Sequence, residues 1–353
     1  MERNYSSELI LVTGVSGFLG SQTAAHLLGK GYKVRGTVRS LANKLKIEAL
    51  DGLPNRANLS LVEANLLDSS CWDDIVDGCD GVIHIASPFP SAPPKRESDL
   101  IKPAVEGTLN VLKACTNKRV NRVVFTSSLA AVASLGKHMK EVWNEDDWND
   151  IKKAAPYEKS KTLAEKAAWQ YYQELPPENR FKLTSINPTL ILGPAIVKTD
   201  FTSGELIKQF MTNKLIGIPK INFACVDVRD CARAHVLAME SDISGGKRYI
   251  CSTESVWMKD IGNILRTEFQ KYGYRITKSE LKYCTLCLGG ICDKKARILK
   301  PYWAKIMKAS NARIKEDLHM DFFSIEEMTL AMAYSMIENG VIPNKINPES
   351  KKK

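Results

Sequence analysis

A tyrosine and a lysine four residues apart, Tyr157 and Lys161, are the side chains of this sequence best suited to acid–base chemistry. They begin a stretch of helical period at 157–173, and residues i and i+4 of a helix share one face, so we expect the Lys161 ammonium beside the Tyr157 phenol. A phenol with a pKa of about 10 exchanges protons poorly at neutral pH, and a neighbouring cation lowers that pKa toward a working value. Because the spacing Y-x-x-x-K is common, the pair indicates a site only when other residues support it.

Ser128 is a third candidate, because it directly follows a predicted strand, RVVFTS at 122–127. Open α/β sheets bind ligands at the carboxyl ends of their strands, so a serine there is placed to hydrogen-bond the same substrate oxygen that Tyr157 protonates. Successive side chains of a strand point to opposite faces, so only one of Ser127 and Ser128 faces such a site.

A glycine-rich turn follows the first predicted strand, residues 9–12, and reads G-x-x-G-x-x-G from Gly14 through Gly17 to Gly20. Glycines at these places permit a tight turn, let the backbone approach a pyrophosphate and bring the following helix close, with its N-terminus toward the phosphates. The alternative is a glycine-rich turn without a ligand. Its position as the first strand-to-helix connection of an alternating chain favours a dinucleotide site.

The residue that selects between NAD and NADP stands at the end of the second strand, about 20 residues further on. That position holds Arg39 rather than an acidic residue, and Lys44 and Lys46 follow on the next predicted helix. A guanidinium binds a 2′-phosphate through two hydrogen bonds, and an ammonium adds charge nearby. The sequence therefore favours NADP(H), although Lys44 and Lys46 are equally compatible with a solvated helix face.

These residues must be positioned by an alternating series of strands and helices. The sequence predicts further strands at 33–38, 59–63, 81–86, 122–127, 182–187 and 247–251, and helices at 18–29, 41–50, 99–117, 157–173, 227–241 and 256–271. This alternation predicts an α/β fold of Rossmann type, a doubly wound, mainly parallel sheet with a smaller C-terminal substrate lobe. We expect the NADP-binding domain at 1–190, with a later strand and helices from 226–272, the substrate lobe at 191–225 and 273–345, and a basic tail at 346–353.

Composition excludes several classes of protein. With 353 residues, 44% of them hydrophobic and 25% charged, the chain has the composition of a soluble globular protein. We find no signal peptide, no apolar run of about 18 residues and only irregularly spaced cysteines, so we expect a cytoplasmic protein with reduced thiols. His84 and His235 lie in apolar stretches and no metal-binding cluster accompanies them, so we expect core histidines and no metal.

Cys284 and Cys287 form a C-x-x-C without a second pair. Buried structural cysteines are the favoured interpretation, because free cysteine is among the most buried residue types. Weak docking of this apolar run, 284–292, at a membrane surface beside Lys294, Lys295 and Arg297 is left open.

The formal charge of +10 is unevenly distributed. Residues 1–150 hold 17 basic and 18 acidic side chains, whereas 151–353 hold 33 and 22, including a net +7 in 271–353. We find no nucleic-acid recognition motif and no aromatic stacking platform, so nucleic acid is not expected as a partner. Two interpretations of the excess stay open, an anionic substrate tail or contact with an anionic surface.

Taken together, the motifs resemble the extended short-chain dehydrogenase/reductase superfamily, also called the NAD-dependent epimerase/dehydratase superfamily, and within it the dihydroflavonol 4-reductase-like family. The likeness covers most of the chain. It is carried by VTGVSGFLG at 12–20, TVR at 37–39, VIHIASPF at 82–89, PAVEGTLNVL at 103–112, VVFTSS at 123–128, YEKSKTLAEKAAW at 157–169, NPTLILGP at 187–194 and VDVRDCARAHV at 226–236.

The resemblance implies roles for individual residues. Tyr157 is the implied proton donor, Lys161 its partner and ligand of the nicotinamide ribose, and Ser128 the group that polarises the carbonyl. The implied cofactor contacts are Gly14, Gly17, Phe18, Leu19, Arg39, Ala86, Ser87, Pro188 and Thr189. To these we add Gly20, the third glycine of the turn, and Lys46, on the predicted helix after Arg39. Near the adenine the family usually has Asp-Leu, and this chain has Asn65 and Leu66.

The family implies an NADPH-dependent reductase, or in reverse a dehydrogenase, of a ketone or aldehyde. Flavonoid-reducing members carry an asparagine where this chain has Ala133, and cinnamoyl-CoA reductases carry a different run around the tyrosine, so neither named activity is expected. The alternatives are a hydroxysteroid dehydrogenase/isomerase or a sugar-nucleotide epimerase of the same superfamily, and a non-enzymatic NADP-sensing protein. The substrate and the oligomeric state are not specified by the sequence.

Overall fold

The computed structural model describes residues 5–87, 96–134, 140–198, 201–292 and 299–347. The last two residues of the VIHIASPF motif and most of the expected basic tail lie outside these ranges.

Seven parallel strands form the main sheet, in the order β3-β2-β1-β4-β5-β6-β9. Their bounds are β1 (Leu9–Thr13), β2 (Lys33–Val38), β3 (Leu59–Glu63), β4 (Gly81–His84), β5 (Arg122–Thr126), β6 (Lys182–Pro188) and β9 (Arg248–Cys251). The strand order reverses between β1 and β4, which is the place where open α/β sheets bind ligands. The predicted Rossmann-type fold is confirmed.

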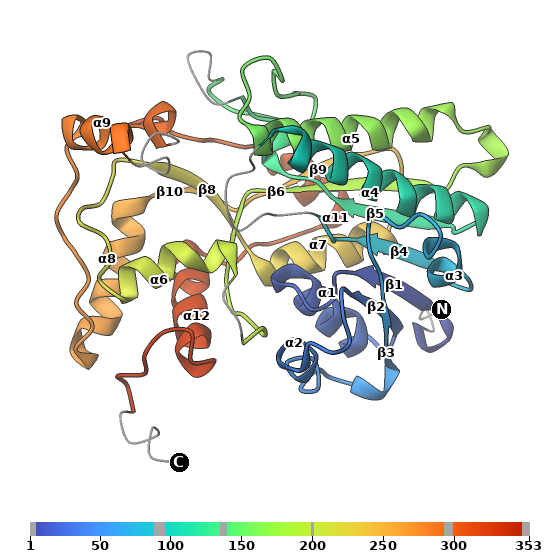
Figure 1. Cartoon of the computed structure of the whole chain (residues 1–353), viewed down its shortest axis with the longest axis horizontal. Coiled ribbons are helices and arrows are strands. Elements are labelled where there is room, and N and C mark those ends of the chain that lie inside the picture. Colours follow the sequence, from blue (N-terminus) through green and yellow to red (C-terminus); the bar gives the residue numbers. More distant parts are fainter. Residues whose placement is uncertain (1–4, 88–95, 135–139, 199–200, 293–298, 348–353) are drawn as a thin grey trace.

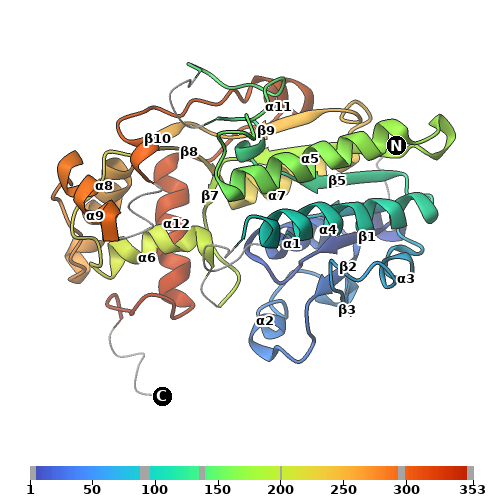
Figure 2. The same cartoon turned by 45° about the horizontal axis from the view of Figure 1, so that its top comes forward.

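Helices cover both faces of this sheet (Figure 1 and Figure 2). On one face α1 (Phe18–Gly29) and α7 (Val228–Glu240) pack with alternate residues of β1, including Ile10. On the other face α3 (Trp72–Val76), α4 (Ser98–Asn117) and α5 (Pro156–Glu174) enclose Leu11. The strand is almost continuously apolar because both of its faces are buried. The short helix α2 (Lys44–Glu48) follows β2.

A second, three-stranded sheet begins the smaller lobe. β7 (Leu190–Leu192) runs parallel to β8 (Asn222–Asp227), which pairs antiparallel with β10 (Ser255–Trp257). The helices of the smaller lobe are α6 (Glu205–Met211), α8 (Met258–Phe269), α9 (Tyr283–Cys292) and α12 (Ile325–Glu338), and α11 (Ala312–Leu318) packs back against β9.

A separate hydrophobic cluster joins α6, α8 and α12. Helix α8, which was expected with the NADP-binding domain, therefore packs with the smaller lobe, whereas α7 and β9 pack with the main sheet. The domain boundaries that these contacts suggest stay a proposal.

The structure corrects the interpretation of the C-x-x-C. Each of the eight cysteines that the structure describes is free, and Cys284 is exposed while Cys287 is half-buried. The interpretation as buried structural cysteines is therefore wrong for Cys284. The physical reason is that α9 lies at the outside of the smaller lobe, where only Leu286 among residues 283–287 is buried. No helix in the described part of the chain is long and apolar enough to span a bilayer.

The glycine-rich turn depends on close packing between β1 and α1. Gly14 has a φ of 69°, in the left-handed region that favours glycine. A Cβ built on Gly20, in the first turn of α1, would lie 2.2 Å from the carbonyl oxygen of Gly14. Because that contact is with backbone, it cannot be relieved by rotating a side chain, so the turn and the helix can approach each other only with glycine at this position.

We therefore expect Gly20→Ala to lower the free energy of unfolding by about 1 to 3 kcal/mol, the usual range for overpacking. Gly29→Ala on the same helix is the matched control, because a Cβ there would meet nothing within 4 Å. It should be neutral or slightly stabilising. Urea denaturation measures both variants, and equal stability of the two would contradict the close packing.

Candidate active site

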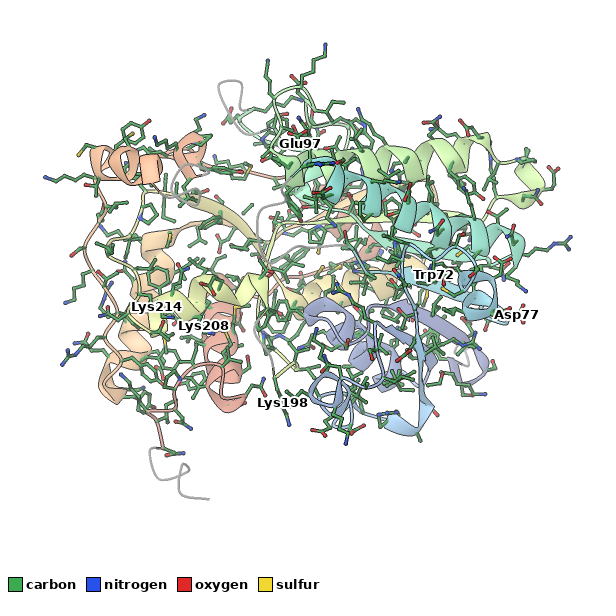
Figure 3. The ribbon with its side chains drawn as sticks, viewed as in Figure 1. Trp72, Asp77, Glu97, Lys198, Lys208 and Lys214 are labelled. Carbon is green, nitrogen blue, oxygen red and sulfur yellow. The ribbon has the colours of Figure 1, made fainter. Side chains whose placement is uncertain are left out.

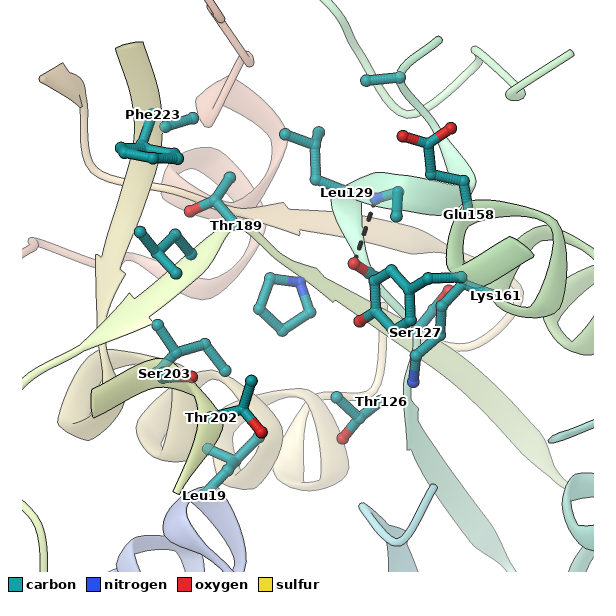
Figure 4. Close-up of a pocket in the computed structure, with 18 of the residues that line it drawn as sticks. Leu19, Thr126, Ser127, Leu129, Glu158, Lys161, Thr189, Thr202, Ser203 and Phe223 are labelled. Carbon is teal, nitrogen blue, oxygen red and sulfur yellow. Dashed lines mark hydrogen bonds between the residues drawn. The ribbon is translucent and has the colours of Figure 1, made fainter. Parts of the chain in front are cut away.

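A cavity of about 590 Å³ lies where the carboxyl ends of the main strands meet the smaller lobe. Figure 4 shows Lys161, Leu129 and Thr189 around it. Its walls consist of Phe18, Leu19, Ile85, Ser87, Thr126, Ser127, Ser128, Leu129, Ala130, Ala133, Tyr157, Glu158, Lys161, Pro188, Thr189, Leu190, Ile191, Phe201, Thr202, Ser203, Asn222, Phe223, Ala224, Tyr302 and Met307.

The structure brings Tyr157, Ser128 and Lys161 together in one wall of this cavity. Tyr157 lies in the first turn of α5, and Lys161 lies one turn later on the same helix. Ser128 follows β5, and its hydroxyl hydrogen-bonds the Tyr157 phenol and accepts a hydrogen bond of 3.1 Å from the backbone N–H of Ala130. The neighbouring Ser127 hydroxyl instead donates to Glu165, at 2.5 Å.

Burial dominates the acid–base properties of both groups. It raises the pKa of the Tyr157 phenol, and the hydrogen bond with Ser128 lowers that pKa only in part. Burial also lowers the pKa of Lys161 to about 8, against a smaller opposing effect of Glu165. The Lys161 ammonium donates to the Ser87 hydroxyl at 3.1 Å. Lys161 is not among the groups that shift the pKa of the Tyr157 phenol here, so the expected lowering by Lys161 stays a prediction.

A buried carboxylate, Glu165, hydrogen-bonds several of the elements that form this wall, and the sequence reasoning did not identify it. Its side chain is fully buried and faces the main sheet. It accepts hydrogen bonds from the side chains of Ser127 on the loop after β5, Trp169 on α5, Ser185 and Asn187 on β6, and Arg248 on β9. The Arg248 guanidinium lies 2.7 Å from it and stacks 3.8 Å from the Trp148 ring. The available signal was the spacing, since Glu165 continues the helix face of Tyr157 and Lys161 by one further turn.

The predicted dinucleotide residues cluster at the carboxyl ends of β1, β2 and β4. Gly17 is the N-cap of α1, and no side chain caps the helix there. The turn is held by the Gly14 N–H, which donates to Thr37 Oγ1 at 3.0 Å, and by the Ala86 N–H, which donates to Thr13 Oγ1 at 2.9 Å. A Cβ on Gly14 would meet Ala86 at 3.2 Å. A helix N-terminus that no side chain caps, preceded by glycines at 14 and 17, fits a pyrophosphate.

Arg39 comes directly after β2 and is exposed, as are Lys44 and Lys46. Among the described residues none of these three side chains has a hydrogen-bonding or ionic partner, so the cationic groups are free for a phosphate. Lys46 lies on α2 and not at a strand end.

The remaining predicted residues fall into two groups. Phe18, Leu19, Ser87, Pro188 and Thr189 line the cavity itself. Asn65 and Leu66 follow β3, which pairs with β2, the strand that Arg39 follows. The Asn65 side chain accepts from the Leu67 N–H at 3.1 Å.

Sequence reasoning did not identify the lining residues that the smaller lobe supplies, Phe201, Phe223, Tyr302 and Met307. These residues come from separate segments of the smaller lobe without a shared motif. His84 and His235 are buried, and burial lowers the pKa of His84 to about 3 and of His235 to about 4. The described residues contain no group of side chains suited to a metal ion.

The chain is similar to known proteins over most of its length. A model of the NAD dependent epimerase/dehydratase family matches residues 10–251. Dihydroflavonol 4-reductase of Arabidopsis thaliana is 38% identical over 275 residues, which are 75% of this chain and 70% of that protein. Cinnamoyl-CoA reductase 1 of Petunia hybrida is 34% identical over 348 residues, covering 97% and 96% of the two chains.

Solved structures are similar over almost the whole chain. The crystal structure of yeast methylglyoxal/isovaleraldehyde reductase Gre2 complexed with NADPH superposes with a TM-score of 0.78 and 26% identity. The match covers 94% of this chain and 99% of that one.

The lowered pKa of Lys161 predicts a specific pH dependence of stability. Between pH 8 and 10.5 the unfolded chain keeps a proton that the folded chain has lost, so this group makes stability rise with pH in that window. Below pH 8 the full penalty of a buried ammonium applies. We expect Lys161→Met to be more stable than the parent protein at pH 7, by a margin that shrinks above pH 8.

Urea denaturation at pH 7, 8.5 and 9.5 measures that margin. Lys166→Met, at an exposed position of the same helix, is the control and should show a constant difference. A margin for Lys161→Met that does not change with pH would contradict the assignment.

Proposed function

The chain belongs to the NAD-dependent epimerase/dehydratase family, and we propose that within this family it is an NADPH-dependent reductase of a ketone or aldehyde. Membership confirms the resemblance drawn from the motifs. In the reverse direction the same reaction is the oxidation of a CH–OH group with NADP⁺. The observation that carries the proposal is the Tyr157 phenol hydrogen-bonded to the Ser128 hydroxyl in the wall of a cavity that Lys161 also lines.

NADPH, when bound, supplies the hydride that the carbonyl carbon receives. The protein's own residues act on the carbonyl oxygen. The Ser128 hydroxyl donates a hydrogen bond to that oxygen and polarises it, and the Tyr157 phenol donates the proton that completes the alcohol. The Lys161 ammonium stabilises the phenolate left behind, through its charge. Ser87, which accepts from Lys161, orients the ammonium within the cavity.

Arg39 supports NADPH over NADH. Its side chain lies at the carboxyl end of β2, next to the glycine turn, and a guanidinium matches a phosphate with paired hydrogen bonds. The Gre2 structure named above contains NADPH, which is consistent with this choice of cofactor.

Tyr157→Phe tests the reaction. It removes only the hydroxyl, so we expect kcat/KM for NADPH-dependent carbonyl reduction to fall by about 100-fold or more. NADPH binding, measured by cofactor fluorescence, should survive. Tyr172→Phe on the same helix is the control, because Tyr172 packs beside Arg180 away from the cavity, and it should retain activity. Unchanged reduction by Tyr157→Phe across a panel of aldehydes and ketones would disprove the proposed role.

Arg39→Ser tests the choice of cofactor. We expect KM for NADPH to rise about tenfold or more, since the lost ion pair acts only on the 2′-phosphate, while KM for NADH changes little. Arg119→Ser is the matched control, because Arg119 is an exposed arginine before the amino end of β5, whereas Arg39 follows the carboxyl end of β2. Equal effects on both cofactors would argue against 2′-phosphate recognition. Stoichiometric NAD released from the denatured protein would favour an epimerase instead.

A further inference from the structure

The charges inside the cavity differ from those of the chain as a whole. Among the described residues that line it, Lys161 is the one cation and Glu158 the one carboxylate. The rest of the wall is apolar or neutral, including Leu129, Phe223 and Met307. Apart from Lys161, the basic residues of the second half that the structure describes therefore do not line this cavity. Figure 3 shows Lys208 and Lys214, for example, at α6 and the loop after it.

Glu158 is held in place by two donors. Its side chain is only 6% exposed. One carboxylate oxygen accepts from the backbone N–H of Ala155, the N-cap residue of α5, at 3.0 Å. The other accepts from the Tyr302 hydroxyl at 3.0 Å. Both partners donate, which is the arrangement that a negatively charged carboxylate requires.

Tyr302 brings the smaller lobe into contact with this carboxylate. The residue is in a short 3₁₀ helix at Lys300–Tyr302, and it lines the cavity together with Glu158. Burial raises the pKa of the Tyr302 phenol, and the nearby charge of Glu158 raises it further, so the phenol stays a donor. Figure 4 shows Glu158 and Leu129 at the same cavity, and Glu158 directly follows Tyr157 in the first turn of α5.

A buried negative charge acts strongly on a second one. Two like charges about 7 Å apart at an effective dielectric constant of about 20 repel by enough to weaken binding more than tenfold. The described lining offers a substrate no cation besides Lys161, and Lys161 lies beside the proposed reacting carbonyl. An anionic group elsewhere on a substrate would therefore meet repulsion without a compensating partner.

We propose that Glu158, fixed by Tyr302, is a specificity-determining residue that restricts the cavity to carbonyl compounds without a negative charge. This inference rests on the proposed reductase function and names the substrate class of the same site. It selects against the anionic substrate tail that the basic composition left open.

The test compares methyl 4-formylbenzoate with 4-formylbenzoate, which share ring and aldehyde and differ in charge. We expect the parent protein to reduce the ester with a kcat/KM at least about tenfold higher. The two aldehydes also differ in intrinsic reactivity, so the decisive quantity is the change of this ratio in Glu158→Gln. There we expect the ratio of kcat/KM for the acid to kcat/KM for the ester to rise about tenfold.

The amide is a close substitute for the carboxylate. Its oxygen can accept from the Ala155 N–H, and its NH₂ can donate to the Tyr302 hydroxyl, which then accepts. Glu174→Gln removes the same charge from an exposed position of α5 and should leave the ratio unchanged. Tyr302→Phe keeps the carboxylate, so discrimination against the acid should persist.

The outcomes separate the two proposals. Failure of the parent protein to oxidise NADPH with any neutral carbonyl compound would contradict the reductase function. Reduction of the ester with a ratio that Glu158→Gln does not change would overturn the role of Glu158 alone. If Glu158→Gln does not fold, competitive inhibition of the parent protein decides. The product analogue 4-(hydroxymethyl)benzoate should then bind about tenfold more weakly than its methyl ester, and equal inhibition would overturn the inference.

Discussion

A single buried carboxylate, Glu165, is the constraint around which the site is arranged. A charge removed from water must be fully hydrogen-bonded and paired, so it draws donors from every element near it. Those donors come from β6, β9, α5 itself and the loop after β5. The last of them, Ser127, precedes Ser128, while Lys161 and Tyr157 stand one and two turns before Glu165 on α5. Satisfying one charge therefore fixes the serine relative to the tyrosine and lysine.

The two ends of the stretch of α5 that holds Tyr157 and Lys161 meet different parts of the molecule. Glu165 faces the main sheet, where burial and pairing hold it rigid. Glu158, at the first turn, faces the cavity and receives the Tyr302 hydroxyl from the smaller lobe. The helix thus connects the surface proposed to perform the chemistry with the wall proposed to select the substrate. Residues of one helix can take both proposed roles because α5 contacts the main sheet through Glu165 and the smaller lobe through Glu158.

The charged residues of the chain as a whole differ from those that line the cavity. The basic excess after residue 150 would suit an anionic ligand, yet the described cavity wall has one cation, Lys161. Arg39 has its own place at the end of β2, outside this wall. Net charge is a property of the whole surface, whereas recognition depends on the few groups that face a ligand. Contact of the outer basic surface with an anionic surface stays an open interpretation of the composition.

The sequence alone determined the elements whose signals are local. The strands at 33–38 and 59–63 and the helix at 18–29 agree residue for residue with the structure, since strand period, helix period and glycine turns act over neighbouring residues. The positions of Tyr157, Lys161, Ser128 and the glycine turn followed from those elements and from the family motifs. Only the tertiary structure decided that Glu165 holds this wall, that Cys284 is exposed, and that Tyr302 reaches Glu158. Glu165 and Glu158 contact residues that are far apart from them in the chain. Both carboxylates become buried and fully hydrogen-bonded only once the chain has packed.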